Sequence, residues 1–562
     1  MLDILQLAEV EAYSGRSFAP VHNDSYPIHE SAMTLKPLFI ALSLTLFACS
    51  KAPEPAPPIA PGAAAPSAAA IAAHGIAWQS GDVDAVFAAA KSDRKPVFLY
   101  WGAKWCPPCN QVKATIFDRQ DFIERSRHFA PVYVDGDSPS AQRLGSRFKV
   151  SGYPTMILFT PDGREITRLP GEVDADQYMR VLALGMNGAR PVKETLAAAL
   201  SSGSDSGNRL SPDDWRMLSF YSWDTDEGEL VAKGDVATTL QRLAKACPAG
   251  ESATATRLEL QALTALATAK DMKPRNDPVA VAFLRKVLAD PETSRANFDI
   301  LTNYAGKLAK SVALPKSREG AELATAWNAA LSRFAGDASL STADRLSALT
   351  AQVELAKRGD DEAPVPAALQ ASVRAEVARA DHETTDPYAR QAVISTAADA
   401  LEEAGLLAES DALLKAELTR SHSPYYFMLG LAANAKKRGD KTAALEWYEK
   451  AYADADGPAT RLQWGVAYVN ALVDLAPQDA MRIEATASHV IRELEAKPDT
   501  FFGRNQRALE RLGKKLAAWD KGNRHHDSLQ RIRVQMAGVC GSVPTADPAR
   551  ALCDGALRPK SA

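Results

Sequence analysis

Between residues 83 and 184 the spacing of the hydrophobic residues changes from one segment to the next. Apolar residues at 83, 86, 87 and 90 recur at helical spacing, whereas residues 97–101 form a short apolar run of strand length. The predicted elements are helices at 83–90, after 109, at 141–148 and at 174–184, and strands at 97–101, 131–134, 156–160 and 164–169. A Pro-Asp-Gly turn joins the last two strands as a hairpin. This order predicts an α/β domain over residues 75–190.

Beyond residue 211 the hydrophobic residues keep helical spacing with few strand signals. A Ser/Gly-rich segment at 201–211 is the predicted flexible linker, and the composition then shifts to Ala, Leu, Glu and Lys. Small and large residues repeat with a 34-residue period at Ala397, Ala398, Leu401, Gly405 and Leu414, and again at Leu431, Ala432, Ala435, Gly439, Ala444, Tyr448 and Ala451. The spacing resembles two tetratricopeptide (TPR) hairpins. We therefore expect a multidomain chain, in which the α/β domain precedes an all-α TPR-like solenoid at 212–530 and a C-terminal tail at 531–562.

Such a stack of helices has two interpretations. It can offer a concave surface to a partner, or its helices can simply pack on one another or dimerise. The aromatic residues that follow the linker favour core packing over a ligand site; they are Trp215, Phe220, Tyr221 and Trp223.

The first 49 residues contain a predicted export signal. Residues 38–47 are ten uncharged residues, half of what a bilayer-spanning helix needs, and they match the apolar core of a secretory signal. Translation from Met33 would give a signal at 33–49 and leave 1–32 as a non-native or disordered extension. The final Leu-Phe-Ala-Cys resembles a bacterial lipobox, which implies lipidation of Cys49. A plain cleaved signal and a short buried helix are the alternatives.

A tether follows the signal. Residues 50–73 are rich in Pro and Ala and contain six prolines. Such a segment buries no core and favours extended polyproline II, so it would hold a domain roughly 50–70 Å from its anchor. The expected location is the bacterial cell envelope, with the protein facing the periplasm as a membrane-anchored lipoprotein.

Charge excludes one class of partner. The formal net charge of −4 and the pI near 6.2 give no basic face, so we expect no nucleic-acid binding.

The six cysteines are too few for a disulfide scaffold in 562 residues. Cys540 and Cys553 flank a Gly/Pro-containing loop and are candidates for a structural disulfide, which would leave Cys247 unpaired and buried. Half of a zinc site is the alternative for the pair Cys106 and Cys109, but no second Cys-x-x-Cys motif or paired Cys/His spacing accompanies it. We therefore predict no metal.

The strongest chemical signal is Trp-Cys-Pro-Pro-Cys at 105–109, directly after an apolar strand. Together with Gly-Tyr-Pro-Thr at 152–155, the Pro-Asp-Gly hairpin and Leu-Pro-Gly at 169–171, it resembles the thioredoxin superfamily, and within it the C-terminal domain of DsbD-type disulfide reductases and related periplasmic proteins. The resemblance covers about 115 residues, a fifth of the chain.

That resemblance implies a division of roles in the dithiol. Cys106, partly exposed at a helix N-terminus, would be the thiolate nucleophile, with Lys104 as a further cation. Cys109 would resolve the mixed disulfide. Trp105 would shield the thiols from one side. Tyr153, before a cis Pro154, would pair its backbone with a substrate segment.

Two positions bear on the rate of disulfide exchange and on the direction of electron flow. The family carries a buried Asp where this chain has Tyr100, and a phenol is a poor base at neutral pH, so proton transfer at Cys109 would use water or another group. Pro108 stands before the second cysteine, as in thioredoxin. The expected reduction potential therefore lies in the reducing half of the range from about −270 mV for thioredoxin to about −120 mV for DsbA.

The sequence thus predicts a thiol–disulfide oxidoreductase that reduces protein disulfides, takes electrons from an upstream donor and uses no cofactor beyond its own disulfide. The alternative is a helical scaffold lipoprotein whose thioredoxin-like domain binds partners without turnover. An oxidase or isomerase would need a higher reduction potential.

Overall fold

The computed structural model describes residues 75–558, apart from 139, 151, 172, 189, 202–209, 315, 358–359, 361–362 and 495–496. The expected signal with Cys49, the tether and most of the linker lie outside the described residues. Within the described residues, no helix combines the length and apolar character needed to cross a membrane.

The α/β domain has the predicted order of elements. Its bounds are α3 (Val83–Asp93), β1 (Val97–Gly102), α4 (Pro107–Val112), the π-helical turn η2 (Lys113–Phe117), α5 (Gln120–Ser126), β2 (Ala130–Asp135), α6 (Ala141–Arg147), β3 (Thr155–Phe159), β4 (Glu165–Leu169) and α7 (Ala175–Met186). The helix α5 was not foreseen, and the helix carrying Cys109 begins two residues before it, because Pro107 and Pro108 fit the first helical turn.

The four strands form one sheet in the order β2-β1-β3-β4. β1 runs parallel to β2 and antiparallel to β3, and β3 pairs antiparallel with β4. Every residue of β1 is buried, because successive side chains enter two different cores. Phe98 and Tyr100 face α4, η2 and α7, whereas Leu99 and Trp101 face α3 and α6. The central strand therefore ends, at Gly102, inside the protein.

The helical region, residues 192–557, is a succession of paired helices. Its elements are α8 (Val192–Leu200), α9 (Pro212–Ser219), η3 (Lys233–Asp235), α10 (Val236–Ala246), α11 (Ser252–Ala267), α12 (Pro278–Ala289), α13 (Pro291–Ala296), α14 (Phe298–Asn303), α15 (Ala305–Val312), α16 (Arg318–Ala335), α17 (Thr342–Lys357), α18 (Ala367–Glu383), α19 (Pro387–Glu403), α20 (Leu407–Glu417), α21 (Pro424–Lys437), α22 (Lys441–Asp454), α23 (Pro458–Leu475), α24 (Ala480–Arg492), η4 (Pro498–Phe501), α25 (Gly503–Trp519), α26 (His526–Gly541) and α27 (Pro548–Gly555).

The two predicted hairpins are α19–α20 and α21–α22. Gly405 and Gly439 lie in their turns with φ of +78° and +76°, a backbone region that favours glycine. The helix pairs confirm a helical C-terminal region, whereas their assignment as TPR-like stays a prediction. Trp215, Tyr221 and Trp223 pack into one buried core with α10 and α11, as the core interpretation expects.

Residues 531–555 are not a tail. α26 and α27 fold back onto α24, α25 and η4, with Asp547 capping the first turn of α27. The disulfide Cys540–Cys553 joins these two helices and is fully buried in the same core. Cys247 is free, as expected, but half-buried rather than buried; burial and Glu251 raise the pKa of its thiol to about 11.

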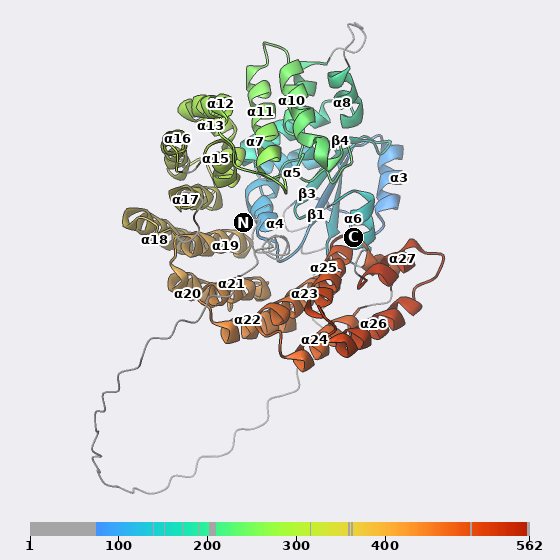
Figure 1. The fold of residues 1–562 in the computed structure, drawn as a ribbon. Coiled ribbons are helices and arrows are strands. Elements are labelled where there is room, and N and C mark those ends of the chain that lie inside the picture. Colours follow the sequence, from blue (N-terminus) through green and yellow to red (C-terminus); the bar gives the residue numbers. More distant parts are fainter. Residues whose placement is uncertain are drawn as a thin grey trace, which may run out of the picture.

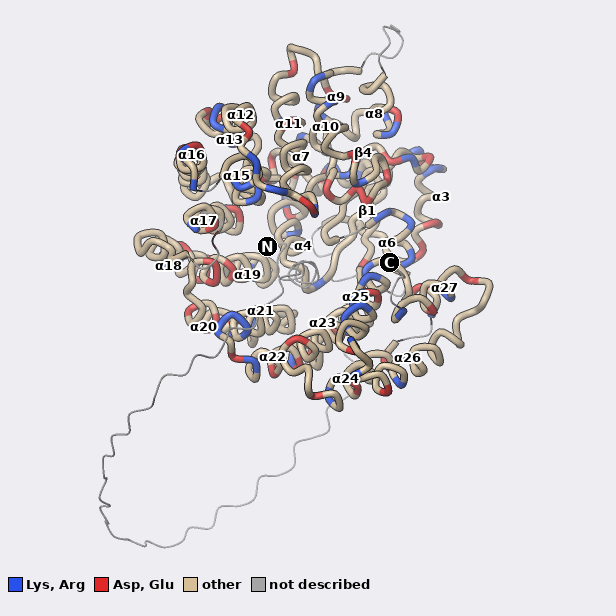
Figure 2. The backbone as a smooth tube through the Cα atoms, viewed as in Figure 1, with Lys and Arg blue, Asp and Glu red and all other residues tan. Residues whose placement is uncertain are grey.

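The helical region curves around the α/β domain. It starts beside β4, passes α17 and α19 next to α4, and ends with α25 and α27 beside α6 (Figure 1). The α/β domain therefore lies against the inner side of the helical region, one of whose two interpretations was a concave surface for a partner. Acidic and basic residues are both scattered over its helices (Figure 2).

A candidate dithiol site beneath the helical region

Cys106 and Cys109 form a disulfide at the start of α4. Cys106 is the N-cap residue, with extended backbone angles, and its Sγ accepts the backbone N–H of Cys109 at 3.2 Å. Unpaired N–H groups and the positive end of the helix dipole stabilise a thiolate at such a position. The side-chain amide of Asn110, which the sequence analysis missed, donates to the carbonyls of Lys104 and Cys106 at 3.0 and 2.8 Å and holds the loop in place.

Some of the residues predicted to support the dithiol have the expected geometry, and Lys104 has a different partner. The Tyr153–Pro154 peptide bond is cis, as predicted. The ring of Tyr153 lies edge-on to Trp105 with centroids 6.2 Å apart. The ammonium of Lys104 pairs with Asp456 of the helical region at 3.4 Å. We predicted Lys104 as a cation for the thiolate, but its ion-pair partner in the structure is this carboxylate.

The polar groups beneath the dithiol bear on proton transfer. The hydroxyl of Tyr100 is buried without a hydrogen-bond partner, and burial next to Asp135 raises the pKa of this phenol far beyond the physiological range. Tyr100 is thus a poor base, as expected. Asp135 pairs with Gly102 in the sheet register, and burial raises the pKa of its carboxyl. Burial lowers the pKa of Lys113, which interacts with Asp135 from η2. The Asp135 carboxyl thus interacts electrostatically with both Tyr100 and Lys113.

The dithiol is buried, which corrects the expectation that Cys106 is partly exposed. The exposed fractions of Cys106 and Cys109 are 2% and 0%. Both belong to a core that also contains residues of α21 and α23, among them Tyr425, Tyr426 and Trp464. The helical region covers the dithiol, and no local pattern in the sequence predicts this contact.

Trp105 makes four of the contacts between the α/β domain and the helical region. Its ring stacks on Tyr426 at 5.8 Å between centroids and meets the edge of Trp464 at 4.9 Å. Its indole N–H donates to the hydroxyl of Thr460 at 2.9 Å, and its carbonyl accepts from the amide of Gln391 at 3.1 Å. Trp105 was expected to shield the thiols; in the structure it also fixes them to the helical region.

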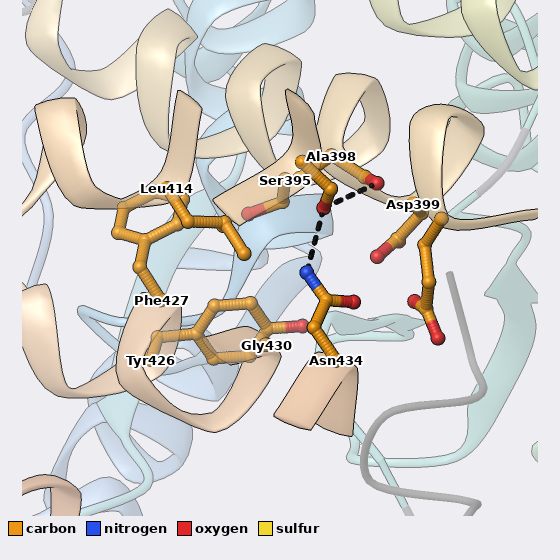
Figure 3. A pocket seen from close by; sticks show the side chains of 10 residues that line it. Ser395, Ala398, Asp399, Leu414, Tyr426, Phe427, Gly430 and Asn434 are labelled. Atoms are coloured by element: carbon orange, nitrogen blue, oxygen red, sulfur yellow. Dashed lines mark hydrogen bonds between the residues drawn. The ribbon is translucent and has the colours of Figure 1, made fainter. Parts of the chain in front are cut away.

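Tyr426 connects this contact to a small hollow between the two hairpins. The hollow is lined by side chains of α19, α20 and α21, and Asn434 and Ser410 form a short hydrogen-bonded chain to the carbonyl of Ala398 across it (Figure 3). Burial near Asp399 raises the pKa of the Tyr426 hydroxyl. The hollow lies between packed helices of the two hairpins.

A buried carboxylate also joins the α/β domain to the helical region. Asp137, in the loop after β2, accepts the backbone N–H of Thr460 at 2.7 Å and its hydroxyl at 2.5 Å. Burial, with repulsion from Asp135 and Asp456, raises the pKa of Asp137 to about 7.

The contact at Asp137 is expected to weaken as the pH rises. The docked carboxyl binds its proton more tightly than an undocked one, whose pKa is near the ordinary 3.8 of an aspartate. Docking is therefore favoured at low pH and loses free energy between about pH 4 and pH 7. Asp135, Asp456 and the Lys104 ammonium face the same site. Hydrogen exchange of the Thr460 amide, corrected for its intrinsic rate, should accelerate from pH 5 to 7.5. Asp137→Asn should remove that change; an unchanged pH profile in this variant would contradict the assignment.

Within the described residues, no group of three or more His, Cys, Asp and Glu side chains is placed to hold a metal ion.

Known proteins match this chain in the α/β domain. A family model described as a thioredoxin-like domain matches residues 83–185. The thiol:disulfide interchange protein DsbD 2 of Pseudomonas aeruginosa is 31% identical over 120 residues, 21% of this chain and 20% of the relative. DsbD of Pseudomonas fluorescens is 32% identical over 95 residues, 16% of each chain. The disulfide bond reductase DsbH of Chlamydia pneumoniae is 27% identical over 114 residues, 18% of this chain and 65% of the relative.

Two solved structures align with the same part. A thioredoxin from Thermus thermophilus is 24% identical and covers 19% of this chain and 85% of its own, with a TM-score of 0.18. A DsbH oxidoreductase is 22% identical and covers 24% of this chain and 96% of its own, with a TM-score of 0.19. The chain therefore spans a fifth or less of the two DsbD relatives and less than two thirds of DsbH.

Proposed function

We propose that this chain, whose residues 83–185 form a thioredoxin-like domain, is a thiol–disulfide oxidoreductase that reduces protein disulfides through Cys106 and Cys109. The observation that carries the proposal is the redox pair itself, with Cys106 capping α4 and cis-Pro154 in the preceding loop of β3. The names of the DsbD and DsbH relatives, which describe disulfide interchange and reduction, support it.

The proposed reaction is a two-step exchange. The Cys106 thiolate attacks one sulfur of a substrate disulfide, forms a mixed disulfide and releases the other substrate sulfur as a thiolate, which takes up a proton. The Cys109 thiol then loses its proton, attacks Cys106 Sγ and releases the second substrate thiol. This leaves Cys106–Cys109 oxidised and the substrate reduced by two electrons. An upstream dithiol donor would return the chain to its reduced form, and no other cofactor takes part.

The same proposal assigns the protein to the bacterial cell envelope, held at a membrane by lipid on Cys49. A second disulfide, Cys540–Cys553, fits an oxidising compartment. The direction of electron flow rests on Pro108 and on the word reductase in the name of DsbH.

One observation favours a second candidate function. The helical region buries the dithiol, which fits a scaffold whose thioredoxin-like domain binds partners without turnover. The two candidates differ in whether Cys106 ever forms a bond to another protein.

A mixed-disulfide trap tests the proposal. In cells, Cys109→Ala leaves Cys106 able to attack but removes the thiol that resolves the adduct. We expect a discrete set of captured proteins that a reducing agent releases. The matched control is the double variant Cys106→Ser/Cys109→Ala, in which the captured set should disappear. An empty trap with normally exported protein would favour the scaffold.

A further inference from the structure

Thiol–disulfide exchange needs direct approach of one sulfur to another. The attacking thiolate must reach the disulfide sulfur, so the rate depends on access as well as on thiolate character. In this structure the exposed fractions of 2% and 0% leave no room for an attacking protein at either cysteine. The obstruction is Trp105 with its partners Tyr426, Trp464 and Thr460, which belong to the chain's own helical region.

Around this apolar centre the contact is polar. Arg143 of α6 pairs with Asp547 at 2.8 Å and with Asp499. On the opposite side, the Gln111 amide donates to Asp344 at 2.9 Å. Partly exposed pairs of this kind each contribute little free energy, and polar interfaces between domains commonly allow relative motion. Separation breaks the shared core at Trp105, Cys106 and Cys109, whereas the helix pairs α21–α22 and α23–α24 keep their contacts with each other.

Two glycines let the helical region come close to the domain. At Gly457, with φ of +89°, an added Cβ would lie 2.5 Å from Asp137 Cγ. At Gly503, with φ of +56°, it would lie 2.9 Å from the carbonyl oxygen of Gln142. The next two backbone N–H groups, of Arg504 and Asn505, donate to Gln142 Oε1 at 3.0 and 3.2 Å. Gly457 thus lies against the loop after β2, and Gly503, at the start of α25, lies against α6.

We propose that the helical region is an autoinhibitory cover over the Cys106–Cys109 disulfide. In the closed form seen here the disulfide is protected, and it reacts only after the loops at Gly457 and Gly503 have moved away from Asp137 and Gln142. The inference rests on the proposed function and adds its regulation: a substrate or donor protein must open the contact before exchange.

A pair of wedge variants tests the cover in the oxidised full-length protein. Gly457→Ala places a methyl group against Asp137. Gly439→Ala is the matched control, because its φ of +76° is similar and an added Cβ there meets nothing within 4 Å. Dithiothreitol reduces Cys106–Cys109 by attack on one sulfur, release of the other as a thiolate, and ring closure of the reductant. Acid quenching, alkylation and peptide mass spectrometry then measure the rate at this pair.

We expect reduction of Cys106–Cys109 in Gly457→Ala to be at least tenfold faster than in the natural chain, and in Gly439→Ala to stay within twofold. Gly503→Ala, which wedges the second loop, should accelerate it as well. Retention of the Cys540–Cys553 disulfide in the same samples shows that the helical region remains folded. Equal rates in the natural chain and in both wedge variants would overturn the cover.

This measurement does not depend on turnover. It records how fast a small dithiol reaches the protein's own disulfide, whereas the mixed-disulfide trap records attack on other proteins. Acceleration by the wedges, together with a trap that stays empty in both Cys109→Ala and Gly457→Ala/Cys109→Ala, would support the cover and reject the oxidoreductase. A filled trap with no acceleration would support the oxidoreductase and reject the cover.

Discussion

Cys106→Ser is expected to abolish reduction of a protein disulfide, with a loss of at least 10³-fold from the catalysed rate. A serine hydroxyl is not ionised at neutral pH and cannot form the mixed disulfide, so no step of the exchange remains. Serine keeps the size and the cap position of Cys106, and the fold should persist. Insulin reduction by dithiothreitol, corrected for the uncatalysed rate, provides the measurement.

The effect of Cys106→Ser is best measured in a variant whose dithiol is accessible. Since the dithiol is buried, the natural chain is expected to be slow with insulin, and Gly457→Ala gives the larger signal. The comparison is then between Gly457→Ala and Gly457→Ala/Cys106→Ser. Equal rates in these two proteins would exclude Cys106 as the nucleophile.

Arg168→Met is expected to destabilise the protein by about 3–5 kcal/mol, since it leaves buried polar groups without partners. Arg168 lies in β4 with an exposed fraction of 1%. Its guanidinium donates to the carbonyls of Phe148, Lys149 and Thr225 at 3.0, 2.9 and 2.7 Å and pairs with Glu165 at 3.3 Å. It therefore ties the sheet both to the loop before β3 and to the start of the helical region.

Arg164→Met, on the same hairpin, is the matched control. Arg164 is exposed, and its ion pairs with Asp162 and Glu194 are open to solvent, so a much smaller change in stability is expected. Urea unfolding, followed by circular dichroism, compares the two midpoints. Coincident midpoints would show that the buried hydrogen bonds of Arg168 contribute no net stability.

The features that the sequence predicted are local ones. Strand and helix periodicity placed the elements of the α/β domain within a few residues, because alternation and helical spacing follow directly from which faces are buried. The turns at Gly405 and Gly439 were predictable from the 34-residue repeat. The pairing of Cys540 with Cys553 was predictable from their separation of 13 residues.

The features that the sequence did not predict depend on distant parts of the chain. Trp105 and Thr460, which share a hydrogen bond, are 355 residues apart, and nothing near either residue announces the other. The burial of Cys106, the partner of Lys104 and the role of Asp137 all follow from this contact. The mistaken tail has a different cause: apolar residues recur at helical spacing from Leu529 to Cys540, but the sequence analysis ended the helical region at 530, and α26 packs on α24.

The order of the chain has a consequence for synthesis. All residues of the thioredoxin-like domain leave the ribosome before residue 191, whereas Trp464 and the Asp547 that binds Arg143 follow several hundred residues later. Domains generally fold as units with the N-terminal one first, and contacts of such high sequence separation form last. A chain that ends between α9 and α21 is therefore expected to carry an uncovered dithiol, and completion of the helical region covers it.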